Sequence, residues 1–124
     1  MGRRINVVEK KRYLVACVST IDAIERLKRM HLKMQTDYMD RSLKIDRGRL
    51  MIVGDRIEVY FVTATQFWSG VVNGHLFNGM ICSPYFEARA SAKVNEIYEM
   101  KLEQTIRTYG VNDADGILKM YVRG

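Results

Sequence analysis

The fold is decided by one run of six apolar residues, Tyr13-Leu14-Val15-Ala16-Cys17-Val18, which follows three basic residues and ends at Ser19-Thr20. A continuous apolar run of this length is typical of a strand that is buried on both faces. After it the hydrophobic period becomes helical, and Ser19 or Thr20 can cap the new helix. The apolar side of this helix carries Ala23, Ile24, Leu27, Met30 and Met34. The segment therefore predicts a strand–turn–helix unit, which is the opening of an α/β layer.

The rest of the chain adds strands and one long helix. Residues 50–53 and 57–62 predict a hairpin, with Gly54-Asp55 supplying the positive φ of a two-residue turn. A strand is expected within 76–82, a helix from Ser83-Pro84 to Gly110, and a last strand over 117–122. Residues 35–49 and 63–75 are interpreted mainly as loops. We predict a single α/β domain over 1–124 with a mixed sheet, two main helices, the order β-α-β-β-β-α-β and a basic arm at 1–11; α+β is the alternative.

Length and composition exclude several classes of protein. The chain has 124 residues, close to the commonest size of one domain, and its 48% hydrophobic content excludes a disordered or collagen-like chain. The sequence holds no apolar run of the roughly 18 residues that a membrane span needs. Cys17 and Cys82 both stand in apolar runs, as reduced core thiols do. We therefore expect a cytoplasmic protein without a disulfide, a metal site or a membrane anchor.

Positive charge is concentrated at the start of the chain. Residues 1–49 hold 13 Lys and Arg against six Asp and Glu, a balance of +7, whereas the whole chain carries +6. Arg26, Arg29 and Lys33 recur along one side of the first predicted helix and would form an exposed basic stripe. Such a surface favours an anionic partner, namely nucleic acid, a nucleotide or an acidic protein surface. The alternative is a well-solvated surface without a partner.

The order of elements resembles the P-loop ATPase core of phage terminase large subunits over about residues 12–123. The matching pieces are residues 13–18 running into Ser19-Thr20 and a helix, the strand within 54–64, a loop with Gly70, and residues 77–82 before a helix and a last strand. The motifs that such ATPases need are missing. The chain has no Gly-Lys-Ser/Thr to hold phosphates, and residues 80–82 run into Ser83-Pro84 instead of an acidic pair. If the relation holds, the chain is a remnant or a mimic of that fold, and we expect no ATP hydrolysis.

No other catalytic arrangement stands out in the sequence. His31 lies beside Lys28 and Arg29 and has no carboxylate near it in sequence. His75 lies in a glycine-flanked loop, where functional residues often occur, although a plain surface histidine is the commoner case. His, Cys, Asp and Glu do not cluster at metal-ligand spacing. We therefore assign no catalytic residue, metal or cofactor.

Two binding sites remain as candidates. Ser19 and Thr20 at a helix N-terminus suit an anion, with Arg26, Arg29 and Lys33 extending the basic face; an ordinary N-cap is the alternative. The loop that holds Phe67, Trp68, Asn73 and His75 suits stacking on bases or a protein hot spot. Its alternative is that both aromatic rings fold back onto the sheet. Tyr85, Phe86 and Arg89 can add to either site.

These observations favour a small non-enzymatic protein that binds nucleic acid or a nucleotide through the basic helix and the aromatic loop. The alternative is a phage-encoded accessory or inhibitory factor that binds another protein through Phe67, Trp68, Tyr85 and Phe86. An apolar terminal strand and eight methionines further predict a homo-oligomer, most simply a two-fold dimer.

Overall fold

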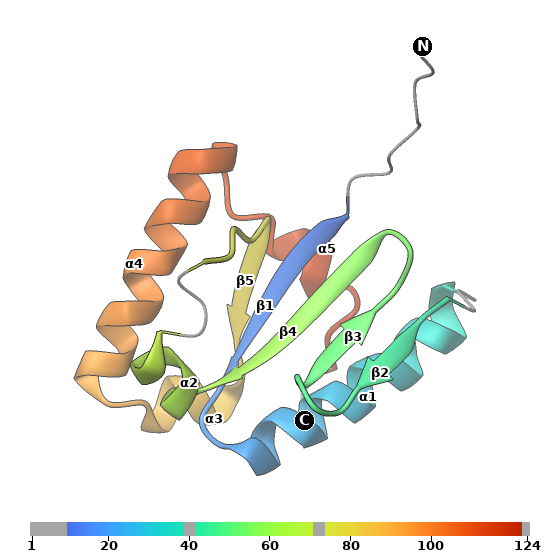
Figure 1. Cartoon of the computed structure of the whole chain (residues 1–124), viewed down its shortest axis with the longest axis horizontal. Coiled ribbons are helices and arrows are strands. Elements are labelled where there is room, and N and C mark those ends of the chain that lie inside the picture. Colours follow the sequence, from blue (N-terminus) through green and yellow to red (C-terminus); the bar gives the residue numbers. More distant parts are fainter. Residues whose placement is uncertain (1–9, 39–41, 71–73, 123–124) are drawn as a thin grey trace.

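A mixed five-stranded sheet with helices on both faces forms the framework of the protein (Figure 1). The computed structural model describes residues 10–38, 42–70 and 74–122. The sheet has the order β2-β3-β4-β1-β5. Its strands are β1 (Lys11–Cys17), β2 (Lys44–Asp46), β3 (Met51–Val53), β4 (Ile57–Thr63) and β5 (Gly79–Cys82). The helices are α1 (Thr20–Tyr38), α2 (Ala64–Ser69), α3 (Pro84–Arg89), α4 (Ala92–Tyr109) and α5 (Ala114–Leu118). The prediction of a single α/β domain with a mixed sheet is confirmed.

Strand β1 is an interior strand of the sheet and is buried on both faces, as its apolar run predicts. It pairs in parallel with β4 on one side and with β5 on the other. Tyr13, Val15 and Cys17 point to one face, while Leu14 and Ala16 point to the opposite face. All five side chains are buried because both faces of the sheet are covered. The basic arm predicted for 1–11 falls outside the described residues up to residue 9, and Lys11 already belongs to β1.

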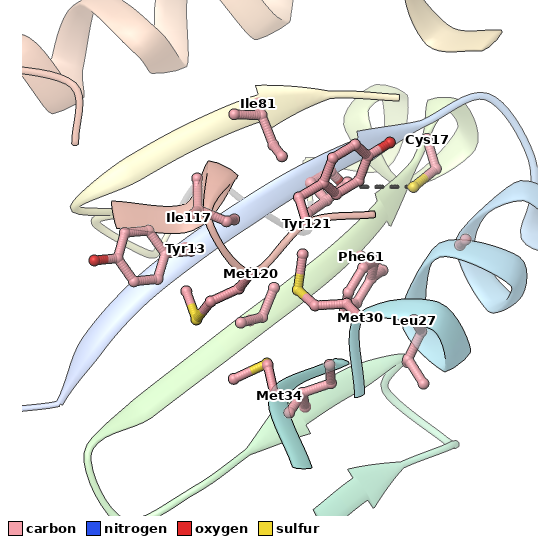
Figure 2. Packing of buried hydrophobic residues seen from close by; sticks show 14 of the residues in the cluster. Tyr13, Cys17, Leu27, Met30, Met34, Phe61, Ile81, Ile117, Met120 and Tyr121 are labelled. Atoms are coloured by element: carbon pink, nitrogen blue, oxygen red, sulfur yellow. Dashed lines mark hydrogen bonds between the residues drawn. The ribbon is translucent and has the colours of Figure 1, made fainter. Parts of the chain in front are cut away.

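Each face of the sheet has its own hydrophobic core. On one face, α1 contributes Leu27, Met30 and Met34, and the α5 region contributes Ile117, Met120 and Tyr121 (Figure 2). On the other face, α2, α3 and α4 close a core that contains Phe67, Phe77, Phe86, Val94 and Tyr98. The chain therefore lies on the first face after β1, and on the second face after β4 and after β5.

The predicted hairpin is present, but its turn differs from the prediction. Strands β3 and β4 pair antiparallel, with Ile52 opposite Val59. Gly54 does not adopt a positive φ. A Cβ atom there would lie 2.9 Å from Leu43 Cδ2, which is the end of a flexible side chain and can shift. Turn geometry therefore does not require glycine at this position. Strand β2 itself lies in a stretch predicted to be loop.

Local caps change two segments of the prediction: one predicted loop is a helix, and one predicted helix is divided into two. Residues 64–69 form α2 because Thr63 and Gln66 make a reciprocal capping box, with the Thr63 hydroxyl accepting from the Gln66 amide. The predicted long helix from residue 84 is broken at Ala90, whose backbone is extended, and α4 begins after its N-cap Ser91. The N-caps Thr63 and Ser91 therefore set helix boundaries that the hydrophobic period alone does not predict.

The predicted final strand over 117–122 is wrong. Residues 114–118 form α5, because the Asp113 carboxylate caps the turn by accepting from the Gly116 amide at 3.0 Å. Ile117, Met120 and Tyr121 then share the spacing of one helical side and enter the core beside β5 (Figure 2). Helical spacing and strand alternation both fit so short an apolar segment, and the cap decides between them.

The free edge of β5 is covered by one side chain in place of a sixth strand. The Asn112 side-chain oxygen accepts from the Met80 amide at 2.7 Å, and its NH₂ group donates to the Met80 carbonyl at 3.1 Å. The homo-oligomer predicted from an open terminal strand loses that premise as well, because residues 117–122 do not form a strand. Exposed Ile106 and Tyr109 on α4 are the apolar surface on which the prediction now depends.

Candidate functional site

A groove lies where the carboxyl end of β1 meets that of β5. The connection after β1 leads to α1 on one face of the sheet, whereas the connection after β5 leads to α3 on the other (Figure 1). In open α/β sheets, ligands bind in the crevice at such a switch point. The groove has a volume of about 470 Å³. We call it the edge groove; it is lined by Val18, Ser19, Ile21, Asp22, Glu25, Arg26, Arg29, Tyr85 and Arg89.

A buried polar network borders the edge groove. The Asp22 carboxylate accepts from the Val18 amide at 3.0 Å and from the Ser83 hydroxyl at 2.6 Å through one oxygen. Arg26 Nε lies 3.6 Å from the other oxygen, and both of these side chains are only 3% exposed. Asp22 Oδ1 and Arg26 Nε have no hydrogen-bond partner within the described part of the chain. The network thus joins the ends of β1 and β5 to the first turns of α1.

The predicted basic stripe on α1 is corrected by the position of Arg26. Its guanidinium is buried and donates to the Val122 carbonyl at 3.3 Å, so Arg26 is not on exposed helix surface. Arg29 pairs with Glu25 at 3.2 Å, and Lys33 pairs with Asp37. Each cation of the stripe therefore has a carboxylate one turn away, and the stripe is close to charge balance.

Ser19 and Thr20 have different positions at the start of α1. Ser19 Oγ accepts from the Asp22 amide at 3.2 Å, which confirms the predicted N-cap. Ser19 also lines the edge groove, whereas Thr20 is exposed and is not among the lining residues. Of the remaining candidates, Lys33 lies outside this groove as well.

Helix α3 brings a third arginine to the groove. Arg89 is exposed, and its guanidinium carbon lies 5.5 Å from the centre of the Tyr85 ring, in cation–π contact. Tyr85 itself is 46% exposed. Arg26, Arg29 and Arg89 are thus brought to one cavity from two helices. No local sequence signal pairs α1 with α3, since only the parallel β1–β5 register places them side by side.

A second groove of about 510 Å³ lies between α2 and α4. We call it the Lys101 groove; it is lined by Phe67, Trp68, Gly70, Ile97, Met100, Lys101, Glu103, Gln104 and Arg107. Trp68 is 59% exposed, as predicted for an aromatic binding residue. Phe67 is 1% exposed and packs against Phe86 and Tyr98, so its predicted exposure is wrong. The capping box makes residues 64–69 helical and turns Phe67 inward.

Of the other candidates that the structure describes, Phe86 and His75 line neither of the two grooves. Phe86 is fully buried, which removes it as an exposed anchor. Asn73 lies outside the described residues. The His75 ring is partly buried and packs 5.2 Å from the Tyr60 ring and 6.2 Å from the Phe77 ring, which is a structural role. His31 is partly buried on α1, and its Nε2 has no hydrogen-bond partner.

Lys101 is the residue that the sequence reasoning missed. It is only 6% exposed, and burial lowers its pKa below the ordinary value. Its position in the α4 pattern is the one signal that could have revealed it, because Val94, Tyr98 and Thr105 are buried on the same side of the helix. Ile106 and Tyr109, two apolar residues of the same helix, are in contrast 46% and 41% exposed.

The two cysteines are separate, free thiols, as predicted. Cys17 is buried and Cys82 is partly buried, and burial raises the pKa of both. Among residues 10–38, 42–70 and 74–122, no group of three His, Cys, Asp or Glu side chains could hold a metal ion. None of the described helices is long and apolar enough to cross a bilayer.

Comparison with known proteins gave no match: no family model, no curated protein and no solved structure is significantly similar to this chain. The resemblance to terminase ATPase cores therefore stays a prediction.

Proposed function

We propose that this protein is a non-enzymatic binding module that holds a nucleotide in the edge groove. The observation that carries the proposal is the convergence of Arg26, Arg29 and Arg89 on one cavity at the switch point of the sheet. Guanidinium groups match phosphate geometry, and Tyr85 offers an exposed ring on which a base can stack. The cavity volume of about 470 Å³ falls within the usual range for small-ligand sites.

The charge pattern favours a nucleotide over an extended nucleic acid. Arg26, Arg29 and Lys33 of α1 are each paired with a carboxylate of the same helix, so this stripe does not offer an unbalanced row of charges to successive phosphates. At the edge groove, in contrast, Arg89 adds a charge from another helix, and its described contact is with a ring instead of a carboxylate. The unbalanced positive charge is therefore confined to the edge groove, where it can pair with a single phosphate group.

The test is a pair of double variants that remove the same charge in different places. Arg29→Gln with Arg89→Gln removes two arginines of the edge groove. Arg56→Gln with Arg107→Gln is the control, since Arg107 forms an exposed pair with Glu103 just as Arg29 does with Glu25. Fluorescence anisotropy with labelled ADP and GDP should show at least a tenfold weakening for the first variant, because charged hydrogen bonds contribute about 1.5–3 kcal/mol each. The control should bind like the wild type.

Equal affinities of the two variants, or no nucleotide binding by the wild type, would overturn the proposal. A labelled single-stranded oligonucleotide in the same assay separates the nucleic-acid hypothesis. Tight binding to it that falls steeply with salt, without nucleotide binding, would place that hypothesis first.

A protein partner remains the second candidate, supported by the exposure of Trp68 and Tyr85. The same set of predicted anchors loses Phe67 and Phe86, which are buried. An interaction that is unaffected by salt and lost in Trp68→Ala would favour this function over the first.

A further inference from the structure

The inner side of α4 contains one position that breaks the apolar pattern. Val94, Tyr98 and Thr105 are buried there, and Lys101 lies among them at helical spacing. Its side chain is 6% exposed, although lysine is almost never fully buried without a partner. A lysine at such a position is costly to the fold and points to a reason beyond packing.

Among the described residues, Lys101 has no counter-ion. Its Nζ donates to Gln104 Oε1 at 2.9 Å and lies 5.6 Å from the centre of the Phe77 ring. In the part of the chain that the structure describes, no carboxylate lies within the 4.0 Å of an ion pair with this ammonium. Burial lowers the pKa of Lys101 for this reason, since nothing offsets the loss of hydration. A negative charge placed beside Nζ would be stabilised strongly.

The groove beside Lys101 is open and has both an apolar and a polar part. The groove of about 510 Å³ holds exposed Trp68 and Met100, which are 59% and 63% exposed, together with Ile97. The other charged pair on its lining, Glu103 and Arg107, is already matched at 3.5 Å. A ligand for this groove therefore needs one anionic group and a flat apolar body. A phosphate dianion would require more donors than one lysine and one amide provide.

We propose that the Lys101 groove binds a small aromatic carboxylate, whose charge is the missing counter-ion of Lys101 and whose ring packs on Trp68 and Met100. This site is separate from the edge groove, and its proposal does not depend on the proposed nucleotide function. Its ligand class differs as well, because one negative charge on an aromatic ring replaces a phosphate.

Trp68 is the only tryptophan of the chain and reports on the groove directly. We use 1-naphthoate and its neutral isostere 1-naphthamide as probes, and follow Trp68 fluorescence with calorimetry as a second readout. The wild type should bind naphthoate at least tenfold more tightly than naphthamide. Lys101→Met keeps the apolar stem and removes the charge, so it should bind both probes equally. Lys93→Met is the control, since Lys93 is an exposed lysine of the same helix and pairs with Glu96; it should retain the wild-type preference.

Three results would overturn the proposal: no saturable binding of naphthoate, equal binding of both probes by the wild type, or an unchanged preference in Lys101→Met. A measurement on the wild type covers the case in which Lys101→Met does not fold. The ¹³Cε signal of Lys101 should report a higher pKa with saturating naphthoate than without, because a bound carboxylate stabilises the ammonium. An unchanged pKa would equally reject the site.

Discussion

At the scale of single residues, the Asp22 carboxylate connects three parts of the chain. It accepts hydrogen bonds from Val18 and Ser83 and lies beside the guanidinium of Arg26. The side chains of Asp22 and Arg26 are both buried, and each is 3% exposed. A buried ion pair adds little net stability, but removal of one partner leaves the other charge uncompensated. The network therefore makes the ends of β1 and β5 depend on one side chain.

Asp22→Ala should lower the free energy of unfolding by about 3–5 kcal/mol, because it leaves Arg26 buried without a carboxylate and Ser83 without an acceptor. Urea denaturation measures this change. Glu25→Ala is the matched control, since Glu25 and Arg29 have the same spacing but lie on the surface, with side chains 52% and 41% exposed. It should cost less than about 1 kcal/mol. Equal costs for the two variants would contradict a structural role for the buried pair.

At the scale of elements, the edge of β5 depends on the short segment between α4 and α5. Asn112 occupies both backbone groups of Met80, and the Asp113 amide donates to the Asn78 carbonyl at 2.9 Å. Side chain and backbone together continue the hydrogen-bond pattern that another strand would have provided. An edge closed in this way offers no template for a second chain.

Asn112→Ala should destabilise the protein by about 1–3 kcal/mol, since the Met80 amide then loses its acceptor. The same variant should associate at high concentration, which light scattering detects. Asn95→Ala serves as comparison, because the Asn95 amide donates to a single carbonyl, that of Ala90. If Asn95→Ala lowers the free energy of unfolding as much and self-associates to the same extent, then the edge of β5 is not the cause of these effects.

The elements that the sequence predicts well are those marked by long apolar runs or a strong cap. The run from Tyr13 and the hairpin around Gly54-Asp55 both predict strands that are present. Helix α5 was missed because an apolar segment near Ile117 fits a strand as well as a helix, and only the Asp113 cap decides. Site residues are harder to predict, because polar residues are assigned to the surface by default. Arg26 and Lys101 are both buried, and only the packing of distant elements makes them so.

At the scale of the whole molecule, burial of titratable side chains couples stability to alkaline pH. Burial raises the pKa of Cys17, Cys82, Tyr98 and Tyr121 above their ordinary values, which are 9.0 for cysteine and 10.0 for tyrosine. The folded protein therefore keeps protons that the unfolded chain loses. Lys101 has a lowered pKa and acts in the opposite direction, but it is a single group.

We expect the free energy of unfolding to be constant near neutral pH and to fall above pH 9.0, where the unfolded cysteines ionise. The loss should reach about 1–3 kcal/mol by one pH unit higher, since each group contributes up to roughly 1.4 kcal/mol per unit. Denaturation at a series of pH values measures it. Cys17→Ala with Cys82→Ala lowers the plateau and should make the decline shallower and shift it towards the tyrosine range. Stability that rises above pH 9.0 would reverse the assigned sign.

The position of β1 between β4 and β5 has a consequence for synthesis on the ribosome. Both partners of this strand lie later in the chain, and β5 is complete only about 65 residues after β1 ends. At a synthesis rate of 5–20 residues per second, β5 is complete roughly 3–13 s after β1 has been made. An uncharged apolar segment exposed for that time is prone to aggregate, and flanking charges are the usual protection. Lys10, Lys11 and Arg12 stand directly before it. We expect these cations to keep the nascent chain from aggregating before they pair with Glu58 or Asp113 in the folded protein.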